Sequence, residues 1–254
     1  MNRPSHPLRM LLPIALTFAV ACGSEAPSPG DAPSTSQVGA DLLGSRVQTG
    51  TGMPTTIPSS TRPRTDGPAP TLDDLGFTEG NSDAPVRIVE FSDFGCGYCR
   101  RFHEETFPTL HDEYIEAGLV EWKFVPMILG IFGPNSEAAA MAGECVGEQG
   151  NFAPMREALF STQSTWKGAD DPIPHFRELA TRGGADVERW NQCMAEAWPD
   201  ERVAFGTALS REAGVRGTPT FFIVGYQAIP GAIPLELFRE VLDTVIARET
   251  SPAN

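Results

Sequence analysis

The sequence predicts an α/β fold made of a β-α-β unit and a β-β-α unit, with a helical segment inserted between them. An apolar, β-branched run at 86–91 precedes a pair of cysteines and a helical pattern, and a second strand-like run follows at 120–125. From 136 to about 214 the apolar residues recur with helical spacing, and strand character returns at 220–224. These three observations define the predicted architecture.

The first unit is expected to begin with a short lead-in at 72–77. After the cysteines, we expect a helix that continues to about Ala117, is kinked at Pro108 and ends at Gly118. Strand, helix and strand in this order predict a parallel pair of strands joined by a crossover.

The inserted segment is expected to contain five helices. Asn135 and Asn151 are candidate N-caps of the first two, and Gly183, Gly184 and Pro199 are candidate breaks. The predicted helices run from Asn135 through Val146, from Asn151 through Phe160, and across 174–182, 187–196 and 201–213.

The last unit is expected to be a hairpin followed by a helix. Gly225 turns the strand at 220–224 so that 227–229 can pair back to it. A terminal helix is predicted over 234–248, with Pro234 in a position that favours helix initiation.

The chain has 254 residues and a formal net charge of −14. A surface of this charge repels a nucleic-acid polyanion, because it cannot replace the counterions bound to the phosphates. We therefore expect no nucleic-acid partner.

The N-terminus is typical of an export signal at 1–21. Basic residues precede an apolar run, Met10–Val20, that is too short to span a bilayer. Ala19-Val20-Ala21 is a cleavage pattern, and Cys22 follows it directly, which resembles a bacterial lipoprotein signal with Cys22 as the lipidated residue. Ordinary secretion is the alternative. Either reading places the mature protein outside the cytoplasm, in the periplasm or at the cell surface.

Residues 22–70 are predicted to be a disordered tether, and 71–254 the folded domain with its insertion at about 136–214. Pro, Ser, Thr, Gly and Ala dominate the tether, aromatic residues are absent, and no apolar periodicity is present.

Cys96-Gly97-Tyr98-Cys99 lies where the first strand meets the first helix. Unsatisfied N–H groups and the helix dipole favour a negative charge on Cys96. Cys99, one turn further into the helix, is the expected resolving thiol. A zinc site is the alternative, but Cys145 and Cys193 do not form a second close pair. We expect a redox dithiol, with no metal and no cofactor.

Two segments resemble the signatures of DsbA-like thiol-disulfide oxidoreductases: Phe91-Ser92-Asp93-Phe94-Gly95-Cys96-Gly97-Tyr98-Cys99 and Gly217-Thr218-Pro219-Thr220-Phe221-Phe222. The resemblance covers about 74–247. It implies a thioredoxin fold with a helical insertion domain and a cis peptide bond before Pro219. It also implies that the backbone at Thr218 pairs with substrate, and Tyr98 is a further candidate for substrate contact.

Glu90 is the candidate proton acceptor for Cys99. It shares a strand face with Ile88 and Ser92, and a buried carboxyl of raised pKa could take the Cys99 proton. Lys123 on the next strand could pair with it; an exposed pair at a strand edge is the alternative. His103 is expected to be a solvated helix residue, and Asp93 is assigned no role because its charge would oppose a thiolate.

Cys145 and Cys193 are expected to form a structural disulfide. In an exported protein two remaining cysteines usually pair, and some DsbA-like proteins carry a second disulfide in this region. Two separately buried thiols are the alternative.

The predicted function is thiol-disulfide exchange with protein substrates through a mixed disulfide at Cys96. The expected substrates are unfolded or reduced exported proteins, and a membrane redox partner recycles the dithiol. A monomeric oxidase with a lipid anchor is the first hypothesis. A reductase or isomerase is the alternative, because Gly97-Tyr98 resembles the pair in some isomerases. A tethered peptide-binding, chaperone-like module is a hypothesis from a different class.

Overall fold

The computed structural model describes residues 70–196 and 198–251. The predicted export signal, Cys22 and nearly all of the predicted tether lie outside these residues. In the part of the chain that is described, no helix is both long enough and apolar enough to span a bilayer.

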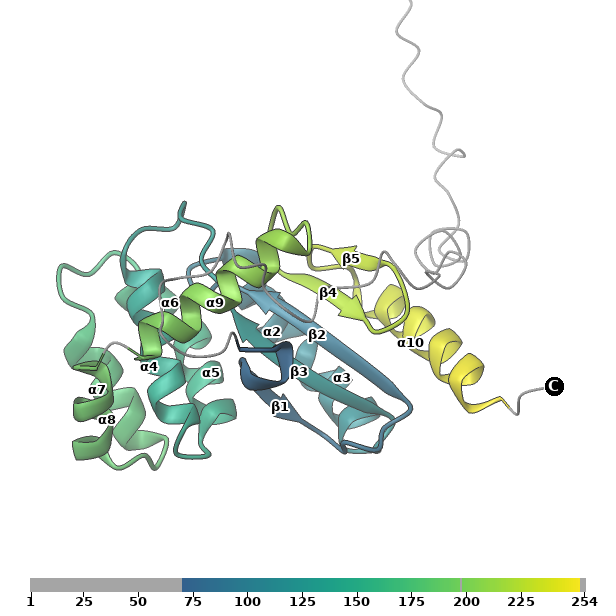
Figure 1. The fold of residues 1–254 in the computed structure, drawn as a ribbon, viewed down its shortest axis with the longest axis horizontal. Coiled ribbons are helices and arrows are strands. Elements are labelled where there is room, and N and C mark those ends of the chain that lie inside the picture. Colours follow the sequence, from purple (N-terminus) through teal and green to yellow (C-terminus); the bar gives the residue numbers. More distant parts are fainter. Residues whose placement is uncertain (1–69, 197, 252–254) are drawn as a thin grey trace, which may run out of the picture. The chain divides into compact units, whose positions relative to one another are not determined.

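A five-stranded sheet in the order β1-β3-β2-β4-β5 forms the centre of the fold (Figure 1). Its strands are β1 Phe77–Glu79, β2 Val86–Ser92, β3 Val120–Pro126, β4 Thr220–Ile223 and β5 Ala228–Pro230. The predicted parallel pairing of β2 with β3 is confirmed, as is the hairpin of β4 with β5. The thioredoxin-type α/β architecture with inserted helices is therefore present.

The lead-in contains a strand that the sequence analysis missed. Leu72–Asp74 is a short 3-10 helix, η1, and β1 then pairs antiparallel with β3, placing Phe77 opposite Phe124. Gly76, with φ +61, permits this approach, because a Cβ there would lie 2.0 Å from the Phe124 carbonyl oxygen. A strand of three residues is too short to show a periodic pattern.

The helix that follows the cysteines is divided into three parts. They are α2 Gly97–Glu105, α3 Phe107–Leu110 and the π-helical turn η2 His111–Ile115. The interruption falls at Thr106, just before Pro108, rather than as a kink in one helix. Pro108 has no N–H and its ring crowds the preceding turn, so the helix ends ahead of it.

In the described residues of the insertion there are six helices, one more than predicted. They are α4 Asn135–Gly147, α5 Phe152–Ser161, α6 Gln163–Trp166, α7 Ile173–Arg182, α8 Val187–Met194 and α9 Trp198–Glu212. The predicted capping role of Asn135 is wrong, because its amide donates to the carbonyls of Trp166, Lys167 and Ala169. Pro199 does not break a helix; it lies in the first turn of α9, where its missing N–H costs nothing.

The core lies on both faces of the sheet. The terminal helix α10 Leu235–Thr250 packs with α2 and α3 around Trp122, Phe221 and Phe238. On the opposite face, Phe205 and Leu209 of α9 pack with Phe91 and Val125. Helices α4 to α8 of the insertion gather at the other end of the sheet (Figure 1), around Phe94 and Phe124. Cys96 and Cys99 belong to this last cluster, so the dithiol lies where the sheet meets the insertion.

Candidate active site

Cys96 is the N-cap residue of α2 and follows β2 by a short turn. Its N–H donates to the Asp93 carbonyl at 2.9 Å, and its own carbonyl accepts from Arg100 N at 3.1 Å, the first bond of the helix. Cys96 and Cys99 are both buried and both are free thiols. The turn therefore places Cys96 at the positive end of the helix and Cys99 inside its first turn.

The pKa values of the two thiols are shifted in opposite directions. The pKa of Cys96 is lowered to about 6, mainly because the Cys99 thiol donates a hydrogen bond to it. Burial opposes this shift, and the Thr218 hydroxyl and two backbone N–H groups make smaller contributions that lower the pKa further. Burial is the main cause that raises the pKa of Cys99 well above its usual value, followed by its interaction with Cys96. In this geometry Cys96 is the more acidic of the two thiols, and Cys99 is the one that keeps its proton.

The Thr218-Pro219 loop lies against the dithiol. The Thr218–Pro219 peptide bond is cis, as the resemblance implies. In its thiol form, Cys96 donates from Sγ to the Thr218 carbonyl at 3.2 Å. The backbone of the loop is thus in direct contact with the reactive sulfur.

Apolar side chains are exposed beside the cysteines. Tyr98 is 63 % exposed and Ile131 75 % exposed. Phe132, next to Ile131, packs so closely on Gly95 that a Cβ on Gly95 would lie 2.6 Å from the Phe132 Cβ. These side chains give the surface around Cys96 an apolar character.

Glu90 is completely buried and is held by two ring nitrogens. Trp122 Nε1 donates to Glu90 Oε2 at 3.1 Å, and His103 Nε2 is hydrogen-bonded to Oε1 at 2.9 Å. The expectation that His103 is solvated is therefore wrong: α2 directs it onto the sheet, where it stacks on Phe160. An i, i+4 relation to Cys99 was the available signal, because such residues share one face of a helix.

The predicted pairing of Lys123 with Glu90 is also wrong. Lys123 lies opposite Val89 in the β2–β3 register, one position from Phe124, which lies opposite Glu90. Side chains alternate along a strand, so Lys123 extends from the other face, where Nζ donates to the Leu75 carbonyl at 2.8 Å. Burial lowers the pKa of Lys123.

The His103–Glu90 pair predicts a pH dependence of stability. Burial is the main cause that lowers the pKa of His103. The unfolded chain therefore binds a proton near pH 6.5 that the folded chain does not, and the free energy of unfolding should fall as the pH drops below that value. In His103→Gln, the amide can still donate to Glu90 but cannot titrate. The free energy of unfolding should therefore fall less steeply with decreasing pH than in the wild type, by up to about 1.4 kcal/mol per pH unit. Urea unfolding at several pH values between 5 and 7 measures it, and equal slopes would contradict the assignment.

Asp93, to which the sequence analysis assigned no role, organises the turn before Cys96. It is fully buried, and its carboxylate accepts from Gly95 N and Leu129 N, each at 2.9 Å, and from the Ser136 hydroxyl. Ser92 was named only for sharing a face with Glu90; its hydroxyl partly opposes the rise in the pKa of Cys99. Both residues shape the dithiol without being part of the cysteine motif.

Gln163 and Lys167, which belong to no recognisable motif, also reach the dithiol turn. Gln163 Nε2 donates to the carbonyls of Phe94 and Cys96, and Lys167 Nζ to that of Gly95. They come from the insertion, 69 residues after Phe94 in the case of Gln163. No local pattern marks a contact of this separation.

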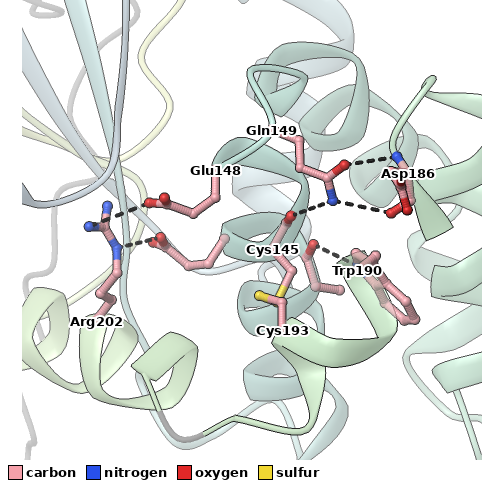
Figure 2. Close-up of a disulfide and its surroundings, with 9 residues drawn as sticks. Cys145, Glu148, Gln149, Asp186, Trp190, Cys193 and Arg202 are labelled. Atoms are coloured by element: carbon pink, nitrogen blue, oxygen red, sulfur yellow. Dashed lines mark hydrogen bonds and ion pairs between the residues drawn. A yellow bond between two sulfur atoms is a disulfide. The ribbon is translucent and has the colours of Figure 1, made fainter. Parts of the chain in front are cut away.

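Cys145 and Cys193 form a disulfide that joins α4 to α8 (Figure 2). Gln149 braces the same two helices: its Nε2 lies 3.3 Å from the Cys145 carbonyl, and its Oε1 accepts from Asp186 N at 2.8 Å. Trp190 Nε1 donates to the Ala142 carbonyl at 3.3 Å. This disulfide lies within the insertion and is separate from the Cys96 and Cys99 thiols.

One surface group of described residues could offer three ligand atoms to a cation. His111, Asp112 and Glu116 each place one such atom within 4.8 Å of the others. Exposed acidic groups often occur in this arrangement without an ion, so the cluster supports no functional assignment.

Comparison with known proteins agrees with this geometry. The sequence model of a thioredoxin family matches residues 74–244. A probable disulfide bond formation protein D of Bacillus cereus is 29 % identical over 159 residues, covering 59 % of this chain and 71 % of that protein. The Na⁺/H⁺ antiporter NhaA 3 of Salinispora tropica is 32 % identical over 152 residues, 60 % of this chain but only 22 % of the antiporter. This chain thus matches about a fifth of that relative's length.

Two solved structures share the fold. Wolbachia pipientis alpha-DsbA1 aligns with a TM-score of 0.61 and 22 % identity, covering 68 % of this chain and 91 % of that one. BdbD from Bacillus subtilis aligns with a TM-score of 0.59 and 21 % identity, covering 77 % of this chain and 98 % of that one. The similarity spans the sheet and the inserted helices together.

Proposed function

Because the chain belongs to the thioredoxin family, as a DsbA-like thiol-disulfide oxidoreductase, we propose that it forms disulfides in exported protein substrates. The observation that carries this direction is the contrast between the two thiols, with the pKa of Cys96 lowered to about 6 and that of Cys99 raised. A stabilised Cys96 thiolate stabilises the reduced dithiol, and a stable reduced form makes the disulfide a stronger oxidant.

The reaction takes place in two exchanges. A substrate thiolate attacks Cys96 Sγ of the Cys96–Cys99 disulfide; the S–S bond breaks, and Cys99 leaves and takes up a proton. A second substrate thiolate then attacks the substrate sulfur of the mixed disulfide, and Cys96 leaves as a thiolate. Two electrons pass from the substrate to the dithiol, and the low pKa of Cys96 makes it the better leaving group in the second exchange.

We propose that Glu90 donates the proton that Cys99 takes up and accepts the proton that Cys99 releases. It is buried two positions before Ser92 on β2, and its hydrogen bond to His103 connects it to the helix that carries Cys99. Substrate is proposed to lie along the Thr218-Pro219 loop, with its backbone paired to Thr218 and apolar side chains near Tyr98. The contact of Cys96 Sγ with the Thr218 carbonyl supports this placement. If the proton role is correct, Glu90→Gln should slow exchange with a changed pH profile.

We also propose that the protein acts outside the cytoplasm as a monomer attached to a membrane through Cys22, where a membrane redox partner reoxidises it. The cleavage pattern before Cys22 and the Cys145–Cys193 disulfide support an oxidising compartment. Cys22→Ser should be lost from the membrane fraction. The purified protein should elute from gel filtration with the mass of a monomer. Equal membrane association of the two proteins would oppose it.

The equilibrium of the dithiol with glutathione tests the direction of exchange. We expect a potential between the reductant value of about −270 mV and the strong oxidant value of about −120 mV, because the Cys96 pKa of about 6 lies between the values of about 7 and about 3.5 of dithiol proteins at those two limits. A value near −270 mV would favour the reductase. No exchange with glutathione or insulin, together with suppression of aggregation by the wild type and by Cys96→Ala alike, would favour the chaperone-like module.

A further inference from the structure

The three carbonyls that lead into α2 are all held by side chains of the inserted domain. Gln163 Nε2 donates to the Phe94 carbonyl at 2.6 Å and to the Cys96 carbonyl at 3.0 Å. Lys167 Nζ donates to the Gly95 carbonyl between them at 2.6 Å. The peptide groups on both sides of Cys96 are thus oriented from α6 and the residue that follows it.

Both donors are themselves fixed in place. Gln163 is buried, and its amide nitrogen serves both carbonyls. The Lys167 ammonium also lies 4.8 Å from the centre of the Phe132 ring, a cation–π contact. The Asn135 amide donates to the carbonyl of Lys167 at 3.3 Å and so ties the backbone of this residue to α4.

This arrangement bears directly on the reactive sulfur. The N–H groups of Tyr98 and Cys99 that stabilise the Cys96 thiolate belong to the first turn of α2, which directly follows the three carbonyls that Gln163 and Lys167 hold. The residues between the cysteines, Gly97 and Tyr98, include no basic side chain. Lys167 places a cation on the carbonyl of the residue immediately before Cys96, within a chain whose net charge is −14.

We propose that Gln163 and Lys167 are positioning residues through which the inserted domain holds the turn at 94–97 and stabilises the Cys96 thiolate. The inference rests on the proposed function, since it concerns the same dithiol. It adds that the inserted domain contributes to the reactivity of Cys96, beside the larger contribution of the Cys99 thiol.

The first test replaces Lys167 with methionine, which keeps the length of the side chain and removes its charge and donor. The rate of alkylation by iodoacetamide between pH 4 and 9 gives the pKa of Cys96. We expect this pKa to rise by about half a unit or more, so that the alkylation rate at pH 5 falls about threefold. The glutathione equilibrium should move towards the disulfide by a similar factor, because the reduced form loses a stabilising charge.

Matched variants separate this effect from a general one. Lys167→Arg keeps a charge and a donor, and the pKa of Cys96 in this variant should stay close to that of the wild type. Arg182→Met removes one positive charge from an exposed site on α7, where its ion pair is with Glu178, and should leave the Cys96 titration unchanged. If Lys167→Met does not fold, Lys167→Gln gives the same comparison with a polar side chain.

Gln163→Met tests the second donor by a different measurement. Without the amide, the Phe94 and Cys96 carbonyls lose their fixed orientation, and the amides of Tyr98 and Cys99 should exchange with solvent several-fold faster at unchanged global stability. A Cys96 pKa in Lys167→Met equal to that of the wild type, or shifted equally in Arg182→Met, would overturn the inference. Failure of the wild type itself to exchange disulfides would instead overturn the proposed function.

Discussion

Replacing Cys96 with alanine is expected to abolish disulfide exchange, with a loss of more than about 1,000-fold in the rate of insulin reduction by dithiothreitol. Cys96 is the sulfur with the lowered pKa and the one that contacts the Thr218 carbonyl, so a mixed disulfide forms on it. Cys99 cannot take over this role, because burial raises its pKa and keeps it protonated at neutral pH.

Cys99→Ala is the matched variant and should behave differently. It keeps the attacking sulfur but lacks the resolving one, so covalent complexes with substrate should accumulate and be visible on non-reducing gels. The Cys99 thiol is also the largest cause of the lowered pKa of Cys96, and this pKa should therefore rise above about 6 in the variant. Alkylation at pH 6 that labels Cys99 before Cys96 in the wild type would contradict the assignment.

The part of the site that the sequence predicted is the part made by neighbours along the chain. Cys96 and Cys99 follow a recognisable strand and begin a recognisable helix, and these two local patterns were enough to predict which thiol has the lower pKa. The burial of Glu90 did not require the predicted alternation, because both faces of β2 are covered and Val89 and Phe91 on its other face are equally buried.

The residues that were missed or misplaced depend on contacts between distant segments. Lys123 was assigned to Glu90 because both lie on adjacent strands, but the register of β2 with β3 places them on opposite faces. His103 is buried between the sheet, where it is bonded to Glu90, and the insertion, where Phe160 of α5 stacks on its ring. Asp93 was judged by its charge alone, whereas its carboxylate accepts from Gly95 N in its own turn and, from distant segments, from Leu129 N and the Ser136 hydroxyl.

Removal of the second disulfide is expected to have the largest effect on stability. In the double variant Cys145→Ala and Cys193→Ala, the free energy of unfolding should fall by about 4 kcal/mol, because the bridge closes a loop with a sequence separation of 48. The hydrogen bonds of Gln149 and Trp190 between the same helices remain, so the double variant should still fold. Urea unfolding of the oxidised wild type and of the variant measures the difference.

The same bridge should not take part in exchange. Burial does not distinguish this bridge, because Cys145 and Cys193 are 1 % and 9 % exposed and Cys96 is 2 % exposed. The difference is in position: Cys145 and Cys193 lie in the last turns of α4 and α8, where the helix dipole does not stabilise a leaving thiolate, whereas Cys96 caps the start of α2. A glutathione buffer that opens Cys96–Cys99 should leave Cys145–Cys193 intact in non-reducing peptide maps. If the two disulfides open together, the bridge is a second redox centre; an unchanged urea midpoint in the double variant would show that it does not stabilise the fold. The wild type should therefore lose one disulfide in such a buffer while its unfolding midpoint changes far less than that of the double variant.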